Sequence, residues 1–191
     1  MARRPSAIAL VALSLATMLA GCFGDVDVVY VPASAVPDDW DHVQDNKTKE
    51  LGGGVEVVVS EYRYSATNSA AVYAIGATDV WFVDESDRLL DQVVSFARSA
   101  DVELTQTATS VRTLADGTEV RVREYDIRKS EPWGEASGQA WILDWDTGGF
   151  FAGAIGFATT EYRPTGLLGT GTRGDDTQWR ETQEMLLSLR H

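Results

Sequence analysis

Cys22 is the residue whose type and position point most directly to a chemical modification, and it is the only cysteine of the chain. It ends the tetrapeptide LAGC (19–22), which has the form of a lipobox. The small residues Ala20 and Gly21 let an extended backbone enter a signal peptidase. The thiol of Cys22 can be alkylated by a diacylglycerol before the bond between Gly21 and Cys22 is cut. The tetrapeptide therefore predicts a processed chain that begins at a lipidated Cys22.

The segment before Cys22 has the features of a secretory signal. Arg3 and Arg4 form a basic start, and the apolar run over 7–20 contains two polar residues. Such a run is too short to cross about 30 Å of hydrocarbon comfortably as a helix, but it matches the apolar core of a signal peptide. An ordinary signal peptide with an incidental cysteine and a signal anchor are the alternatives. The export route, general secretory or twin-arginine, stays open because Pro5 follows the arginine pair.

Nucleophilic catalysis requires a serine or cysteine beside a base, and the chain offers no complete set. Cys22 is consumed by lipid, His42 lies in the N-terminal segment, and His191 ends the chain. The sequence contains no Gly-x-Ser-x-Gly elbow. We therefore predict no catalytic residue and no enzymatic activity. An exported hydrolase that uses a carboxylate pair is the alternative, although no pair stands out among the 29 acidic residues.

Three short patterns approach ligand-binding motifs without completing them. The sequence over 169–174 matches G-x-G-x-x-G, but too few residues follow it for the second strand of a dinucleotide-binding unit. Asp144 and Asp146 match the start of a calcium loop, whose later ligand positions are not filled. Four aspartates and His42 over 38–45 suit a weak cation site, but a hydrated acidic surface explains them better. We predict no metal and no cofactor.

Asn46 begins the tripeptide Asn46-Lys47-Thr48 in a polar stretch of the chain. Such a tripeptide is an acceptor for N-glycosylation at the surface of an exported protein, but it also occurs by chance. Asn46 is therefore a candidate glycosylation residue.

The charge of the chain excludes one class of partner and indicates an environment. Lys and Arg number 16 against 29 Asp and Glu, a formal net charge of −13 that repels the phosphates of nucleic acids. Removal of residues 1–21 takes away two arginines and no acid, which leaves −15. Excess aspartate with only three lysines is the surface expected in concentrated salt, where screening removes self-repulsion. An actinobacterial lipoprotein, rich in arginine and alanine, is the alternative origin.

The chain divides into three predicted segments. These are a lipoprotein signal peptide over 1–21, a lipidated and partly packed N-terminal segment over 22–54, and an α+β domain over 55–191. In the second segment, weak alternation over 25–31 suits a short strand, and a short helix is predicted over 34–43.

Apolar patterning predicts the elements of the domain. Strands are predicted over 55–64, 70–75, 79–83, 104–113, 118–127, 139–145 and 150–159, and helices over 87–99 and 177–190. Because strands and helices do not alternate regularly, the fold class is α+β. We expect a single, mainly antiparallel sheet of about six to seven strands with two main helices packed against it.

Two details of this sheet follow from the spacing of its residues. The dipeptide Asp116-Gly117 is a strong hairpin turn signal, and the flanking Val111, Val120 and Val122 are expected to face the helix over 87–99. The aromatic face formed by residues 141–145 is expected to pack under a helix rather than to line a groove.

Several stretches of the chain resemble a family of secreted haloarchaeal lipoproteins without an assigned activity. They are LAGC, the strand VEVVVSEYRY, the helix SDRLLDQVVSFARSA, the hairpin LADGTEVRVREYDI, and the paired strands AWILDW and GGFFAGAIGFA. The likeness covers most of residues 22–191 and contains no catalytic motif. The order of hairpins and helices also resembles Mog1/PsbP-like domains, at the level of fold only, which implies an accessory or binding module.

These observations together predict a lipoprotein anchored in the cell membrane through Cys22 and facing outside the cytoplasm. Its expected role is that of a non-catalytic binding or envelope-assembly module, with an envelope protein as partner and no nucleic acid. A solute receptor of a transporter ranks last, because about 170 residues are too few for two hinged lobes.

Overall fold

The structure is a computed structural model of the chain. It describes residues 28–51, 55–66, 69–77, 93–95, 97–131, 134–146, 151–164, 172–173 and 176–191. The statements that follow concern these residues.

The elements whose bounds are described are seven long strands, one two-residue strand, the α-helix α3 and one short 3-10 helix. Their bounds are η1 (Ala33–Ala35), β1 (Trp40–Leu51), β2 (Val55–Tyr64), β3 (Ala70–Ala77), β4 (Val102–Thr113), β5 (Glu119–Glu131), β6 (Gly134–Asp146), β7 (Phe151–Pro164), β8 (Thr172–Arg173) and α3 (Asp176–Leu187).

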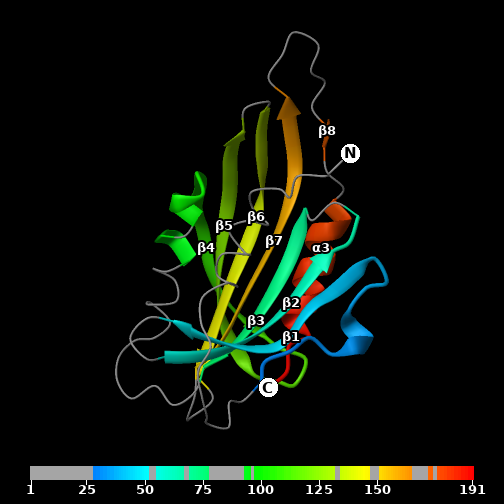
Figure 1. Cartoon of the computed structure of the whole chain (residues 1–191), viewed down its shortest axis with the longest axis vertical. Coiled ribbons are helices and arrows are strands. Elements are labelled where there is room, and N and C mark those ends of the chain that lie inside the picture. The colour runs from blue at the N-terminus through cyan, green and yellow to red at the C-terminus, as the bar shows by residue number, and fades with distance from the viewer. Residues whose placement is uncertain are drawn as a thin grey trace.

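The strands form a single antiparallel sheet in the order β1-β2-β3-β7-β6-β5-β4, with β8 paired to β7 (Figure 1). Two meanders, β1–β3 and β4–β7, meet at the pair β3–β7. The prediction of one antiparallel sheet is therefore confirmed. The strand predicted over 79–83 lies outside the described residues.

Helix α3 covers one face of the sheet, which we call the α3 face, and it contacts β7, β3 and β6 (Figure 1). Met185, Leu186 and Leu189 are fully buried in a cluster with alternate residues of these strands. The members of this cluster on the sheet include Val72, Ala74, Val120, Val122, Trp141, Leu143, Trp145, Ala152 and Ala154. Trp141 also packs edge-on against Trp179 of α3, with ring centroids 5.7 Å apart. The prediction that the aromatic face of 141–145 packs under a helix is confirmed.

Helix α3 packs closely on Gly156 of β7. A Cβ added there would lie 2.6 Å from Leu186 Cδ1 and 2.7 Å from Thr182 Cγ2. Only glycine leaves room for the helix at this distance.

The other face of the sheet, which we call the opposite face, carries a second apolar cluster. Val93 and Ala97 are buried there with Val102 and Ile127. Residues 93–95 and 97–99 are helical, which agrees with the end of the helix predicted over 87–99; the rest of that helix lies outside the described residues.

Two sequence predictions are corrected. Val120 and Val122 belong to the α3-face cluster, whereas Val93 belongs to the opposite-face cluster, so the helix that contains Val93 does not cover these two valines. Val111, which is also expected to face that helix, is 66% exposed. The helix predicted over 34–43 is replaced by the three-residue η1 and the start of β1, because Trp40 onward pairs antiparallel with β2.

Residues 28–31, at the start of the described chain, pair with its C-terminal end. In place of the strand predicted over 25–31, Tyr30 forms an isolated antiparallel bridge with Arg190, with both N–H···O contacts at 3.0 Å. Val29 and Val31 are buried in the α3-face cluster.

The turn between β4 and β5 has the predicted geometry. Gly117 has φ 94°, and the Asp116 carboxylate accepts a 2.9 Å hydrogen bond from the backbone N–H of Thr118. Asp101, just before β4, has φ 57° and is the one described non-glycine residue in the left-handed region.

Candidate functional site

The residues predicted to be processed or modified fall into two groups. Gly21 and Cys22 lie outside the described residues. Asn46 lies in β1, where the pairing with β2 shifts register between Gln44 and Lys47. Its side chain lies outside the described part of the chain.

Within the acidic stretch over 38–45, the described side chains, those of residues 38–44, are not gathered into a site. Asp38 and Asp39 are exposed, and the His42 ring lies flat on Tyr62, with centroids 4.5 Å apart and an interplanar angle of 10°. Among the side chains that the structure describes, no group of three or more His, Cys, Asp or Glu is placed to hold a metal ion.

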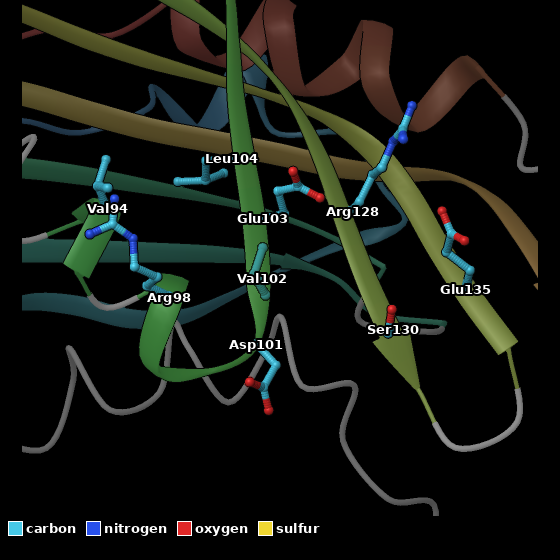
Figure 2. A pocket seen from close by; sticks show the side chains of 9 residues that line it. All are labelled: Val94, Arg98, Asp101, Val102, Glu103, Leu104, Arg128, Ser130 and Glu135. Carbon is cyan, nitrogen blue, oxygen red and sulfur yellow. The ribbon is translucent and has the colours of Figure 1, made fainter.

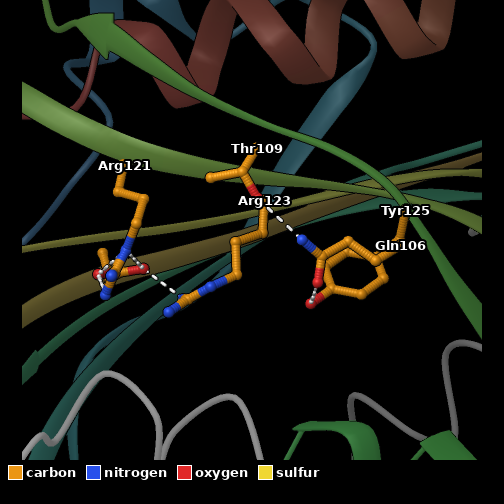
Figure 3. A network of polar contacts seen from close by, with 6 residues as sticks. Gln106, Thr109, Arg121, Arg123 and Tyr125 are labelled. Carbon is orange, nitrogen blue, oxygen red and sulfur yellow. Dashed lines mark hydrogen bonds and ion pairs between the residues drawn. The ribbon is translucent and has the colours of Figure 1, made fainter.

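Asp144, which matches the first residue of a calcium loop, lies buried on the opposite face and is paired with two arginines. Figure 3 shows these arginines, Arg121 and Arg123, side by side on β5. Arg121 Nη2 is 2.6 Å from Asp144 Oδ2, and Arg123 Nη1 is 2.5 Å from Asp144 Oδ1. Arg123 is as buried as Asp144, whereas the Arg121 side chain is 44% exposed. Both oxygens of the Asp144 carboxylate are therefore bound by guanidinium groups and are not available to a calcium ion.

A second buried carboxylate, Glu61, lies on β2 on the same face. It accepts a 2.9 Å hydrogen bond from the Tyr73 hydroxyl and is paired with Arg63. Burial, and then the Glu61 charge, raise the pKa of Tyr73 far above its ordinary value. The hydroxyl therefore stays protonated and serves as a hydrogen-bond donor to Glu61.

The two buried carboxylates belong to separate ion pairs on different strands. Glu61 on β2 and Asp144 on β6 are separated by three strand spacings, which place their backbones about 14 Å apart. Paired carboxyl groups of glycoside hydrolases lie at most about 9.5 Å apart. Each carboxylate is also neutralised by an arginine of its own, so the arrangement suits the burial of charge.

A groove of about 750 Å³ lies on the α3-face side, between residues 28–38 and the first two strands. Its lining combines the rings of Tyr30, Trp40, His42 and Tyr62 with aliphatic side chains and one acid, Asp38. Tyr30 is 41% exposed and is one of the three large apolar side chains exposed in the described chain. Stacked and partly exposed rings in a concave, largely apolar surface are typical of a binding site.

The rings of this groove are held in place through their polar atoms. The Tyr62 hydroxyl accepts a hydrogen bond from Val31 N–H at 3.1 Å and lies 3.3 Å from the Val31 carbonyl oxygen, to which it can donate. Trp40 Nε1 donates to Glu181 Oε2 of α3 at 2.9 Å. The groove is therefore fixed both to the sheet and to the C-terminal helix.

Two other hollows are open and charged. One, of about 890 Å³, lies around the start of β4 and is lined by Arg98, Glu103, Arg128 and Glu135 among others (Figure 2). The other, of about 560 Å³, lies beside the N-terminus of α3 and includes Arg163 and Glu161, which bind each other at 2.8 Å. Opposite charges line both hollows, so neither favours a ligand of one sign.

Sequence reasoning missed the groove, because three of its rings come from residues 28–42, whose composition is typical of a tether. The signal that was available is the cluster of Tyr30, Trp40 and His42 within thirteen residues. The buried pair of Arg123 and Asp144 was missed because it depends on strand register.

No protein-family model, no curated protein and no solved structure matches the chain. Within the part of the chain that the structure describes, no helix is long and apolar enough to cross a membrane.

Proposed function

We propose that the protein is a lipoprotein anchored in the cell membrane through Cys22, facing outside the cytoplasm, and that it acts as a non-catalytic binding or envelope-assembly module. The observation that carries this proposal is the ring-lined groove of Tyr30, Trp40, His42 and Tyr62.

The position of the groove in the chain supports the link to the membrane. Six residue steps separate Cys22 from Val28, which lines the groove, and they span at most about 20 Å when extended. A lipid on Cys22 therefore keeps the groove within reach of the membrane surface, where another envelope component would meet it.

The chemistry of the groove narrows the class of partner. The rings favour an apolar or aromatic group, and Asp38 together with the overall net charge disfavours anions. The expected partner is a neutral or cationic segment of an envelope protein that inserts an apolar side chain.

The proposal includes a second helical layer on the opposite face of the sheet. The helix predicted over 87–99 is proposed to complete a second layer on the opposite face, which would give the α+β arrangement of Mog1/PsbP-like domains. Burial of Val93 and Ala97 on that face supports it.

The alternative, an exported hydrolase with a carboxylate pair, has less support. The two most buried carboxylates of the described residues lie on strands three spacings apart, and each is held by an arginine of its own. A pair of acids placed around one cleft would be required instead.

The test is site-specific photocrosslinking of the full-length protein in its native membranes. A photoreactive phenylalanine replaces Tyr30, whose backbone pairs with Arg190 and whose ring is partly exposed. We expect one predominant adduct, and we expect it to weaken when His42→Ala is added.

Val43 provides the matched control, because it is half exposed, adjoins His42 in β1 and does not line the groove. The same photoreactive residue at position 43 is expected to give no such adduct. Equal adducts from positions 30 and 43, or none from position 30, would overturn the proposal.

A further inference from the structure

The strand at one edge of the sheet, β4, differs from the other edge strand, β1, because a long part of it carries no charge. Residues 104–111 read LTQTATSV and contain no ionisable side chain, although 24% of all residues are charged. The strand is rich in threonine and valine, which favour pairing. Among the strands that the structure describes, β4 has one neighbour, β5 (Figure 1).

The side chains of β4 are open to solvent over most of the strand. Residues 105–109 and 111–113 are exposed, and Val111, at 66%, is the most exposed large apolar residue of the described chain. A long, exposed and uncharged edge strand offers a row of backbone groups to another strand.

The other edge strand has the features that prevent such pairing. β1 has the sequence WDHVQDNKTKEL, with charges along its length, and its pairing with β2 shifts register twice. Charges and bulges are the usual protection of a sheet edge. The two edges therefore differ, and β4 is the one that can accept a strand.

We propose that β4 pairs antiparallel with β4 of a second copy of this chain, about a two-fold axis that passes between Thr107 and Ala108. In this register, Glu103 of each copy lies opposite Arg112 of the other. Leu104 likewise lies opposite Val111, and the neutral residues 105–110 pair among themselves. The interface is isologous, and the sheet continues from one copy into the next.

The bulge in β4 makes this register consistent with the faces of the sheet. Arg112 pairs with Val120, which belongs to the α3 face, and Glu103 pairs with Arg128, the neighbour of the opposite-face Ile127. Glu103 and Arg112 therefore lie on the same face. Without the register shift between Gln106 and Ala108, their odd separation would place them on different faces.

Charge explains why the occupant is a second copy. A chain with a net charge of −13 repels its own copies over most of its surface. At β4 that repulsion is absent, and the two ends of the neutral segment carry opposite charges that match in the antiparallel register. Within one copy, Glu103 points toward Arg128 of β5 (Figure 2), and the Arg112 guanidinium lies over the Trp141 ring, 3.7 Å from Glu124 Oε1. Glu103 is exposed and the Arg112 side chain is 48% exposed, so both can turn toward the second copy.

This self-association is independent of the proposed groove, which lies at the β1 side of the sheet. Loss of the dimer would leave the photocrosslink at position 30 unchanged, and the two proposals can fail separately.

The test is sedimentation of the full chain in density-matched detergent at an ionic strength of about 0.15 M. The wild-type chain is expected to form a concentration-dependent dimer. Glu103→Arg and Arg112→Glu each place like charges opposite each other twice, and each is expected to weaken the dimer about tenfold or more.

Mixing the two variants supplies the decisive control. Positions 103 and 112 are both positively charged in the Glu103→Arg chain and both negatively charged in the Arg112→Glu chain. In a one-to-one mixture, opposite charges therefore face each other at both ends of the interface, and the dimer is expected to return as a heterodimer. Circular dichroism confirms that each variant remains folded. A monomeric wild type, variants that remain dimeric, or a mixture that does not recover would overturn the proposal.

Discussion

Arg123 of β5 and Asp144 of β6 form a buried ion pair on the face of the sheet away from α3, with Nη1 2.5 Å from Oδ1. The two residues are diagonal neighbours, because Asp144 lies directly opposite Arg121 in the strand register. One carboxylate is therefore shared by a buried and a partly exposed guanidinium. The two guanidinium groups neutralise the buried Asp144 carboxylate. On the same face of the sheet, Ile142 and Ile155 belong to the apolar cluster.

Asp144→Asn is expected to lower the free energy of unfolding by about 3–5 kcal/mol, because it removes the negative charge that faces the buried Arg123. Urea unfolding at constant ionic strength measures the change. Arg121→Gln, at the exposed partner, is the matched control and is expected to cost less than about 1 kcal/mol. Equal losses for the two variants would contradict the assigned roles.

Stability at alkaline pH is expected to depend on Tyr73. Its pKa is raised in the folded state by burial and by Glu61, whereas an unfolded tyrosine ionises near about pH 10. A group whose pKa is higher in the folded than in the unfolded state contributes fully to the free energy of unfolding below its unfolded pKa. That contribution is lost as the pH rises from the unfolded pKa toward the folded one. Tyr73→Phe should therefore flatten the fall of the melting temperature between about pH 9 and 11.

Tyr30→Phe is the comparison for this measurement, because its partly exposed ring lies on the other side of the sheet from Glu61. A Tyr73→Phe protein with an unchanged slope would show that the hydroxyl is not held protonated.

Substitution of Gly117 should destabilise the fold through the backbone conformation that this position requires, and not through steric overlap of the new side chain. Its φ is 94°, and nothing lies within 4 Å of an added Cβ. Gly117→Val is expected to cost about 1–3 kcal/mol, and Gly117→Asn clearly less, since asparagine tolerates positive φ. Similar losses for both variants, measured by thermal unfolding, would exclude conformational strain as the cause.

Asp101 offers a second position of the same kind. Because its φ is 57°, Asp101→Val is expected to be strained despite its place in a connecting turn. Asp101→Gly should be close to neutral or stabilising. An Asp101→Val protein as stable as Asp101→Gly would contradict the left-handed conformation.

Cys22→Ser should abolish stable membrane attachment. The two acyl chains of a diacylglycerol hold a protein firmly, whereas a chain without them keeps no such anchor. Fractionation of cells should then show uncleaved precursor or released protein. A processed Cys22→Ser protein that stays with the membrane would exclude the lipid anchor.

The melting temperature of residues 23–191 should rise with added salt. The Debye length falls from about 30 Å at 0.01 M to about 3 Å at 1 M, which screens repulsion among the excess carboxylates. A melting temperature that stays flat or falls over this range would contradict a design for concentrated salt.

Strands with one apolar face could be predicted from the sequence, and those without one could not. β2 was predicted with its observed bounds because alternate valines face the apolar cluster on the side away from α3. β1 was missed because its residues 41–43 are exposed and show no apolar alternation. At an edge, backbone pairing forms the strand without side-chain burial.

The packing of elements that are distant in the chain could not be predicted from the sequence either. Alternation shows that Val120 and Val122 share a face, but not that α3 covers it rather than the helix that contains Val93. The pairing of Arg123 with Asp144 likewise depends on the register of β5 against β6. The Tyr30 ring lies beside the other rings of the groove because Tyr30 pairs with Arg190, at the far end of the chain.

The pairing of β3 with β7 has a consequence for how the chain folds. Ala70 and Ala77 find their partners at Ala158 and Phe151, so the first meander meets the second only after nearly the whole chain has been synthesised. Contacts of such high sequence separation slow folding, since a long loop must close before they form. The nascent chain therefore lacks its central strand pair until late, and the seam between the two meanders cannot form before β7 has been synthesised.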